Sequence, residues 1–187
     1  MGGGRGQKIE AEFELPEKKP LMILIDDEQG LAQPTLVKDA LVDHLAKELK
    51  AHKIVEKVTT NEELGLLRRK HPDFDELSIR EAGRLANADI MIWMRVLQYA
   101  VNDDLDLVVS DGKLAVKLKV FDIREEDPTK IRLWPSQREG KLVDVTVNVH
   151  DIRACKTKQQ VHEQMGIALA DKIAKLFHAH SMEEASQ

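Results

Sequence analysis

Cysteine is nearly absent from this chain, since Cys155 is the only one among 187 residues. A single thiol excludes an intramolecular disulfide framework and any zinc site built from several cysteines. Without cross-links of these kinds, the fold must be stabilised by the packing of its side chains.

Long apolar runs are also lacking. No stretch approaches the roughly 18 consecutive apolar residues of a membrane-spanning helix, because Asp, Lys or Arg interrupts every candidate. The start of the chain, "MGGGRGQKIEA", has no apolar segment of the kind found in a secretion signal. A chain whose signal had been removed would begin in the same way, so this absence leaves the location open.

An excess of positive charge is missing as well. The chain has 28 Lys and Arg against 33 Asp and Glu, a net charge of -5. The bases alternate with acids, as in "KDALVDHLAKELK", so we expect no nucleic-acid binding. With 42% hydrophobic and 33% charged residues, the composition is that of a folded domain.

The length favours one domain with a complete core. We predict a flexible Gly-rich leader over residues 1–8, a single α/β domain over residues 9–180 and a frayed tail over residues 181–187.

The first half of the chain predicts alternating strands and helices. "KIEAEFEL" alternates like a half-buried strand, and "LMILID" is apolar on both faces like a central parallel strand. A helix follows in "TLVKDALVDHLAKELKAH", and "KIVEKVT" is expected to be a short strand. Two further helices are predicted in "NEELGLLRRK" and in "SIREAGRLANA", which starts with a Ser-x-x-Glu capping box.

The second half predicts antiparallel strands and a closing helix. "DIMIWMRVLQYAV" is the strongest candidate for a buried central strand, while "KLAVKLKVFDI" and "LVDVTVNVHDI" alternate like strands with one wet face. A hairpin with a short strand at "IRLW" is expected between those two strands. An apolar stripe at four-residue spacing predicts a long helix in "KQQVHEQMGIALADKIAKLFHAH". These elements together predict a mixed parallel and antiparallel sheet flanked by helices.

Asp26 and Asp27 end the apolar strand "LMILID", and paired carboxylates in that place can hold Mg²⁺. "ILIDDE" resembles the opening of a response-regulator receiver domain, where such a pair lies beside a phospho-accepting aspartate. That family also needs a strand ending in the acceptor, whereas "KHPDFDELSI" offers acids in a polar loop. We therefore expect the pair to bind backbone N–H groups in a turn, and keep a receiver-like phospho-acceptor or small hydrolase as the alternative.

Other candidate sites are weaker. Asp103, Asp104 and Asp106 crowd "NDDLDLVVSDG" without the ligand order of a calcium loop. His150, Cys155 and His162 have irregular spacing for a metal site. There is no Gly-x-Ser-x-Gly, and no Gly-rich loop follows a strand to hold phosphate. We predict no catalytic residues, no metal ligands and no cofactor.

A wider resemblance covers roughly Leu21 to His180. "SIREAGRLANADIMIWMRVLQYAV" followed by "AVKLKVFDIREEDPTKIRLWP" resembles a bacterial envelope superfamily, with "LMILIDD" and "ALADKIAKLFHAH" in matching order. That superfamily includes the curli-secretion lipoprotein CsgG, the lipoprotein activators of penicillin-binding proteins and the amino-terminal domain of TolB.

The resemblance implies a TolB-N/CsgG-like fold, a non-enzymatic protein-binding or adaptor role, and a periplasmic or outer-membrane-associated location. It implies an envelope protein as partner, and is compatible with self-association and with a lipid anchor in the precursor. No lipobox cysteine and no barrel-forming hairpins are present, which argues against a pore. As binding segments we select the exposed turn "DDEQGLAQ", with Asp26, Asp27 and Gln29, and the hairpin with Asp103, Asp104 and Asp106.

Overall fold

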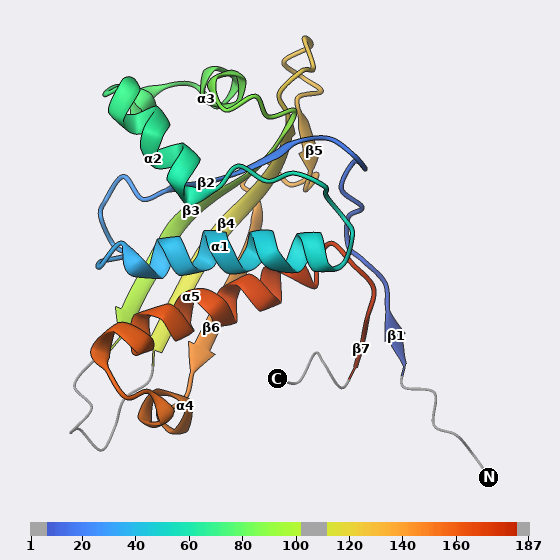
Figure 1. The fold of residues 1–187 in the computed structure, drawn as a ribbon. Helices are drawn as coiled ribbons and strands as arrows, with labels where there is room; N and C mark the ends of the chain where they lie inside the picture. Colours follow the sequence, from blue (N-terminus) through green and yellow to red (C-terminus); the bar gives the residue numbers. More distant parts are fainter. Residues whose placement is uncertain (1–6, 102–111, 183–187) are drawn as a thin grey trace.

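The computed structural model describes residues 7–101 and 112–182 (Figure 1). A mixed sheet is flanked by helices, which confirms the predicted fold class. The described elements, in chain order, are β1 (Lys8–Ile9), β2 (Leu21–Asp26), α1 (Leu36–Ala51), α2 (Asn61–Lys70), the 3₁₀ helix η1 (Phe74–Glu76), α3 (Ile79–Leu85), β3 (Ile90–Val101), β4 (Gly112–Asp122), β5 (Arg132–Trp134), β6 (Lys141–Val147), α4 (Val149–Ala154), α5 (Lys158–Ala174) and β7 (His180–Ser181).

The main sheet has five strands, and β4 is its centre. β2 pairs with β3 in parallel, β3 pairs with β4 antiparallel, and β5 and β6 both pair antiparallel with the other side of β4. β6 lies along the first half of β4 and β5 along its end. β2 is therefore an edge strand and not the central strand that its apolar pattern indicates, and its outer side is paired only at Leu21, with Val58, within the described residues.

One face of this sheet is covered by α1 and α5, which lie side by side across the strands (Figure 1). Alternate strand residues point to this face and form the main core with the helices. The stripe predicted on the closing helix is buried along its whole length, at Val161, Met165, Leu169, Ile173 and Phe177.

The opposite face is covered at one end only. Met22 and Met91 point to this side and pack with Leu64, Phe74 and Ala82, which come from α2, η1 and α3. Beyond this small second core, the strands continue without a helix over them, and Arg95 and Gln98 of β3 are exposed. The sheet is thus three-layered at one end and two-layered at the other.

α1 and α5 approach each other closely at Gly166. A Cβ atom at this position would overlap the backbone carbonyl of Val37 and stand 2.9 Å from the backbone nitrogen of Leu41. Since backbone atoms cannot move aside like the tip of a flexible side chain, only glycine permits this approach.

Most of the predicted helices and strands are confirmed. Both short helices on the second face begin with complete capping boxes, formed by Thr60 with Glu63 and by Ser78 with Glu81. The hydrogen bonds from Ser78 lower the pKa of Glu81, because they favour its ionised form.

Three strand predictions are wrong in extent. "KIEAEFEL" forms a strand only at Lys8–Ile9, which pairs with β7, while Glu12 and Phe13 bond to the carbonyl of Leu176. "KIVEKVT" supplies a single bridge at Val58 instead of a strand. "LVDVTVNVHDI" leaves the sheet after Val147, where the Asn148 side chain accepts from two backbone N–H groups and starts α4.

The amino-terminal segment closes one end of the core through aromatic contacts. Phe13 stacks on Trp134 with a centroid separation of 6.0 Å, and Trp134 meets the edge of Phe177 at 5.9 Å. Trp134 is thereby a partly buried residue that packs against the main core. None of the described helices combines the length and the apolar character that a membrane crossing requires.

We predict that Gly166→Ala lowers the free energy of unfolding by about 1–3 kcal/mol, the usual cost of overpacking a core. Chemical denaturation monitored by circular dichroism would measure it. Gly65→Ala on α2 is the matched control, because its Cβ would lie 3.6 Å from the flexible Arg69 side chain. Gly65→Ala should raise the free energy of unfolding by about 0.5–1 kcal/mol. An equal loss of stability in Gly166→Ala and Gly65→Ala would contradict the close approach of α1 and α5.

Candidate functional site

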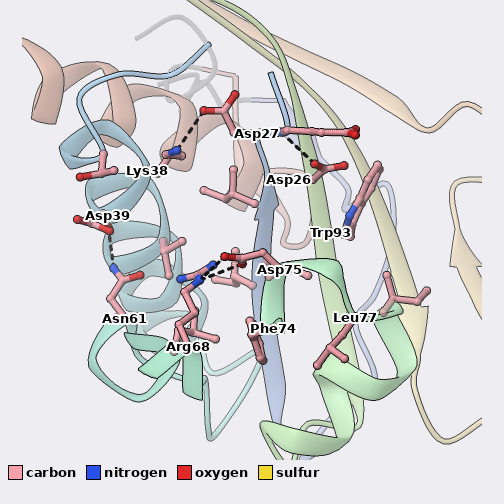
Figure 2. A pocket seen from close by; sticks show the side chains of 18 of the residues that line it. Asp26, Asp27, Lys38, Asp39, Asn61, Arg68, Phe74, Asp75, Leu77 and Trp93 are labelled. Atoms are coloured by element: carbon pink, nitrogen blue, oxygen red, sulfur yellow. Dashed lines mark hydrogen bonds and ion pairs between the residues drawn. The ribbon is translucent and has the colours of Figure 1, made fainter. Parts of the chain in front are cut away.

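Asp26 and Asp27 lie at the carboxyl end of β2, on the rim of a cleft of about 880 Å³. The cleft lies between α1 on one side and α2 with η1 on the other (Figure 2). Successive side chains leave a strand toward opposite faces, so the two carboxylates diverge and point to different partners (Figure 2).

Asp27 lies in the turn that follows β2, with only 4% of its side chain exposed. Its Oδ1 accepts from the backbone N–H of Leu31 at 2.8 Å, and its Oδ2 accepts from that of Ala32 at 3.0 Å. Lys38 Nζ, one turn into α1, donates to Oδ2 at 3.0 Å. Both oxygens are therefore engaged in fixing the turn to the start of α1.

Asp26 is paired with Arg95, its direct neighbour on β3. Arg95 Nε and Nη2 each lie 2.9 Å from Asp26 Oδ2, and the backbone N–H of Glu28 donates to Oδ1 at 3.3 Å. The Arg95 side chain is 53% exposed, so this pair is solvated and weak compared with that of Asp27.

These contacts support the interpretation of the pair as turn residues. A phospho-acceptor site would need a lysine or a third acid close to the aspartates, and Lys38 does meet Asp27. That lysine is bound to the carboxylate itself, however, and backbone N–H groups bind both aspartates. A cation at Asp27 would have to displace three donors.

The other residues that we selected as binding candidates from the sequence are Gln29 and the three aspartates of the predicted hairpin. Gln29 is exposed in the turn that Gly30 N–H closes on the carbonyl of Asp27, where Gly30 has φ +63°. Asp103, Asp104 and Asp106 lie outside the described residues, so their selection stays a prediction.

The cleft itself is acidic. Six carboxylates and two basic side chains line it, and Arg68 of α2 binds Asp75 of η1 at 2.9 Å (Figure 2). Asn61 donates to the carbonyl of Asp39 and to the carboxylate of Asp43, joining the start of α2 to α1. The cleft is thus bounded by contacts that hold α2 and η1 to the rest of the fold.

A second surface adjoins this cleft on the uncovered part of the sheet, and we call it the basic face: Trp93, Arg95, Lys117, Lys119, Arg132 and Arg138. Two cations lie close to the Trp93 ring, with Arg95 Cζ 5.1 Å and Lys119 Nζ 5.4 Å from the ring centroid. Strand register explains the arrangement, because Trp93 is opposite Lys119 and Arg95 is opposite Lys117. Cross-strand partners point to the same face.

The positive charges of the basic face affect one another. Burial lowers the pKa of Lys119, and the nearby charges of Arg132, Arg95, Arg138 and Lys117 lower it further. Among the described residues, the ion pairs to these cations are Asp26 with Arg95 and Glu139 with Lys117. The basic face therefore has more positive side chains than neighbouring carboxylates pair with.

Sequence reasoning missed the basic face. The alternation in "KLAVKLKVFDI" correctly predicts a wet face with lysines, but "DIMIWMRVLQYAV" appears buried on both sides. The missing information is the register that places Trp93 and Arg95 beside those lysines. Arg95 within an apolar run is the one signal that could have indicated an exposed position.

The nucleophile and histidine candidates have other roles. Burial raises the pKa of the Cys155 thiol, and the charges of Asp151 and Glu163 raise it further, so the thiol is not activated. His162 is buried and its Nδ1 is hydrogen-bonded to the Tyr99 hydroxyl, which links α5 to β3.

Comparison with known proteins gives a likeness of shape only. No family model matches the chain, and no curated protein matches it. The lipoprotein GNA1162 from Neisseria meningitidis is 11% identical, with a TM-score of 0.48, over 84% of this chain and 99% of its own. Protein XCC0632 from Xanthomonas campestris is 6% identical, with a TM-score of 0.47, over 88% and 84%.

PelC from Paraburkholderia phytofirmans, a dodecamer, is 10% identical, with a TM-score of 0.42, over 87% of this chain and 91% of its own. At these identities and scores, the likenesses transfer no residue role and no activity to this chain. The structurally similar proteins are bacterial, and one of them is a lipoprotein. The more specific resemblance to CsgG and TolB stays a prediction.

We predict that Asp27→Asn lowers the free energy of unfolding by about 2–3 kcal/mol, because asparagine replaces one acceptor oxygen with a donor and removes the charge that pairs with Lys38. Asp26→Asn, at the solvated pair with Arg95, should cost less than about 1 kcal/mol. Denaturation midpoints of both variants would measure the difference.

The same variants test the alternative chemistry. Millimolar Mg²⁺ or Ca²⁺ should leave the midpoint of thermal unfolding unchanged in the original chain. A metal-dependent rise of several degrees that disappears in the Asp26→Asn/Asp27→Asn double variant would contradict the structural assignment. It would favour a phospho-acceptor or hydrolase site instead.

Proposed function

We propose that this chain is a non-enzymatic binding domain of the bacterial cell envelope, and that it docks an acidic protein partner on the basic face. The observation that carries the proposal is the place of Trp93, which lies near both Arg95 and Lys119 at the edge of the second core, where the helix-covered part of the sheet gives way to exposed strand residues.

The chemistry of this face is that of a protein interface. Trp and Arg are the residue types most often found at the energetic centre of interfaces. Leu142 of β6 is 54% exposed and lies opposite Lys117, so the basic face continues into an apolar residue. Regular strands carry all of these central residues, which fixes their spacing before a partner arrives.

Charge explains why the partner should be acidic. The pKa of Lys119 is lowered, so its protonated form is less favourable in the folded chain than in water. Carboxylates of a partner would reverse this effect and relieve the repulsion among the cations. A long polyanion is less suited, because the whole chain has a net charge of -5 and the neighbouring cleft is acidic.

The envelope location rests on the sequence resemblance to the CsgG, TolB and penicillin-binding-protein activator families. The non-enzymatic role rests on the engagement of Asp26 and Asp27 in the turn and on the unactivated thiol of Cys155. No cofactor is part of the proposal.

The test uses a fluorescent glutamate-rich peptide and measures its binding by anisotropy at low salt. Lys117→Glu/Lys119→Glu should weaken binding at least about tenfold, and added salt should weaken binding to the original chain because it screens exposed charges. Lys47→Glu/Lys57→Glu is the matched control, since both residues are exposed elsewhere and the change of net charge is equal.

An equal loss of peptide affinity in Lys47→Glu/Lys57→Glu would mean that only the net charge of the chain matters. That result would contradict a defined binding surface. Phosphatidylglycerol vesicles serve as the competing probe. Binding of vesicles without binding of the peptide would contradict a protein partner and favour a membrane surface.

Lys119→Met separates binding from folding. The pKa of Lys119 is lower in the folded chain than the 10.5 of the unfolded chain, so protonation of Lys119 opposes folding. As the pH rises toward 10.5 this proton is lost, and the free energy of unfolding increases. We predict that Lys119→Met is at least as stable as the original chain at pH 7, loses this rise, and still binds the peptide more weakly. A loss of stability in urea titrations would show that Lys119 has a structural role.

A further inference from the structure

Three metal-ligating side chains meet on the outer side of the α1–α5 pair, away from the basic face. His44 and Glu48 come from α1, and Asp171 comes from α5. One donor atom of each lies within 4.8 Å of the other two, and no other group of three His, Cys, Asp or Glu side chains in the described residues does so. His44 Nε2 lies 2.7 Å from Asp171 Oδ1 and 3.8 Å from Glu48 Oε1.

The helices fix the three donors. His44 and Glu48 are four residues apart, so they project from the same side of α1. Asp171 lies beyond Gly166, the residue that lets α5 approach α1 closely. Sites on regular, tightly packed elements hold their ligands more precisely than sites on loops.

The donor set suits a borderline transition metal. Imidazole nitrogen with carboxylate oxygens is typical of Zn²⁺ sites, whereas Mg²⁺ and Ca²⁺ prefer oxygen ligands alone. Zinc ligands at about 2.0–2.2 Å from the ion stand about 3.3–3.6 Å apart in a tetrahedron. The separations of 2.7 and 3.8 Å bracket that value, so small side-chain rotations would accommodate an ion.

A second layer of contacts supports Glu48. Its Oε2 lies 3.6 Å from His52 Nε2, and the His52 ring stacks on His178 with a centroid separation of 3.7 Å. Outer partners of this kind orient metal-binding carboxylates. The side chains of His44, Glu48 and Asp171 are 21%, 26% and 48% exposed, so an ion can enter and a water molecule can complete its shell.

We propose that His44, Glu48 and Asp171 form a site for one zinc-class divalent ion, which clamps α1 to α5. The ion takes the place of the hydrogen bond between His44 Nε2 and Asp171 Oδ1, and the neutral imidazole then carries its hydrogen on Nδ1. The sequence gives no motif for the site, because 127 residues separate His44 from Asp171. The proposal is independent of the basic face and of its partner.

The experiment uses the full chain without a histidine tag. Isothermal titration with Zn²⁺ should give one ion per chain, and a saturating excess should raise the unfolding midpoint by about 5–10 °C. Co²⁺ should give visible absorption bands of a site with a nitrogen ligand, and Ca²⁺ and Mg²⁺ should have no effect. His44→Gln and Asp171→Asn should each weaken binding by at least about tenfold.

His150→Gln is the matched control, since His150 is exposed and lies outside the cluster. It should bind Zn²⁺ like the original chain. Absence of stoichiometric binding in the original chain, or binding that survives in both His44→Gln and Asp171→Asn, would overturn the proposal. The contact of His44 with Asp171 would then be an interhelical hydrogen bond only. Because the original chain decides the first outcome, the test does not depend on the folding of the variants.

Discussion

The packing of α1 against α5 over one sheet face is the contact on which the rest of this structure depends. It buries alternate residues of β2, β3, β4 and β6 in one core, and it requires Gly166 at the closest approach. Because both long helices lie on the same face, only α2, η1 and α3 remain for the other. These elements cover one end, and the remaining strand surface is left to polar side chains.

The uncovered surface differs in charge from the cleft next to it. The basic face and the acidic cleft meet at β2, where Asp26 binds Arg95 while Asp27, one residue on, fixes the turn to α1. Because successive side chains point to opposite sides, Asp26 lies at the solvated pair with Arg95, whereas the Asp27 side chain points into the turn and has a structural role. A neighbouring pair of identical residues thus has two different roles, which explains why they do not form one ligand set.

The sequence predicted what depends on local periodicity and capping. The apolar pattern of "LMILID", the capping box at Ser78 and the stripe on α5 all correspond to observed elements. Contacts between distant segments were not predictable. Strand register brings Trp93 beside Lys119, and helix packing brings His44 to Asp171, but neither leaves a periodic trace in the chain. "KIEAEFEL" failed because alternation shows a half-buried segment without showing whether a strand pairs with it.

The most direct test of the basic face is the emission of Trp93 in the Trp134→Phe variant, where it is the one remaining tryptophan. Titration with the glutamate-rich peptide at low salt should change its intensity or wavelength saturably, and salt should reverse the change. Phe at position 134 keeps an aromatic ring between Phe13 and Phe177, so the fold is preserved. Peptide binding that leaves the Trp93 emission unchanged would place the partner elsewhere and contradict this account.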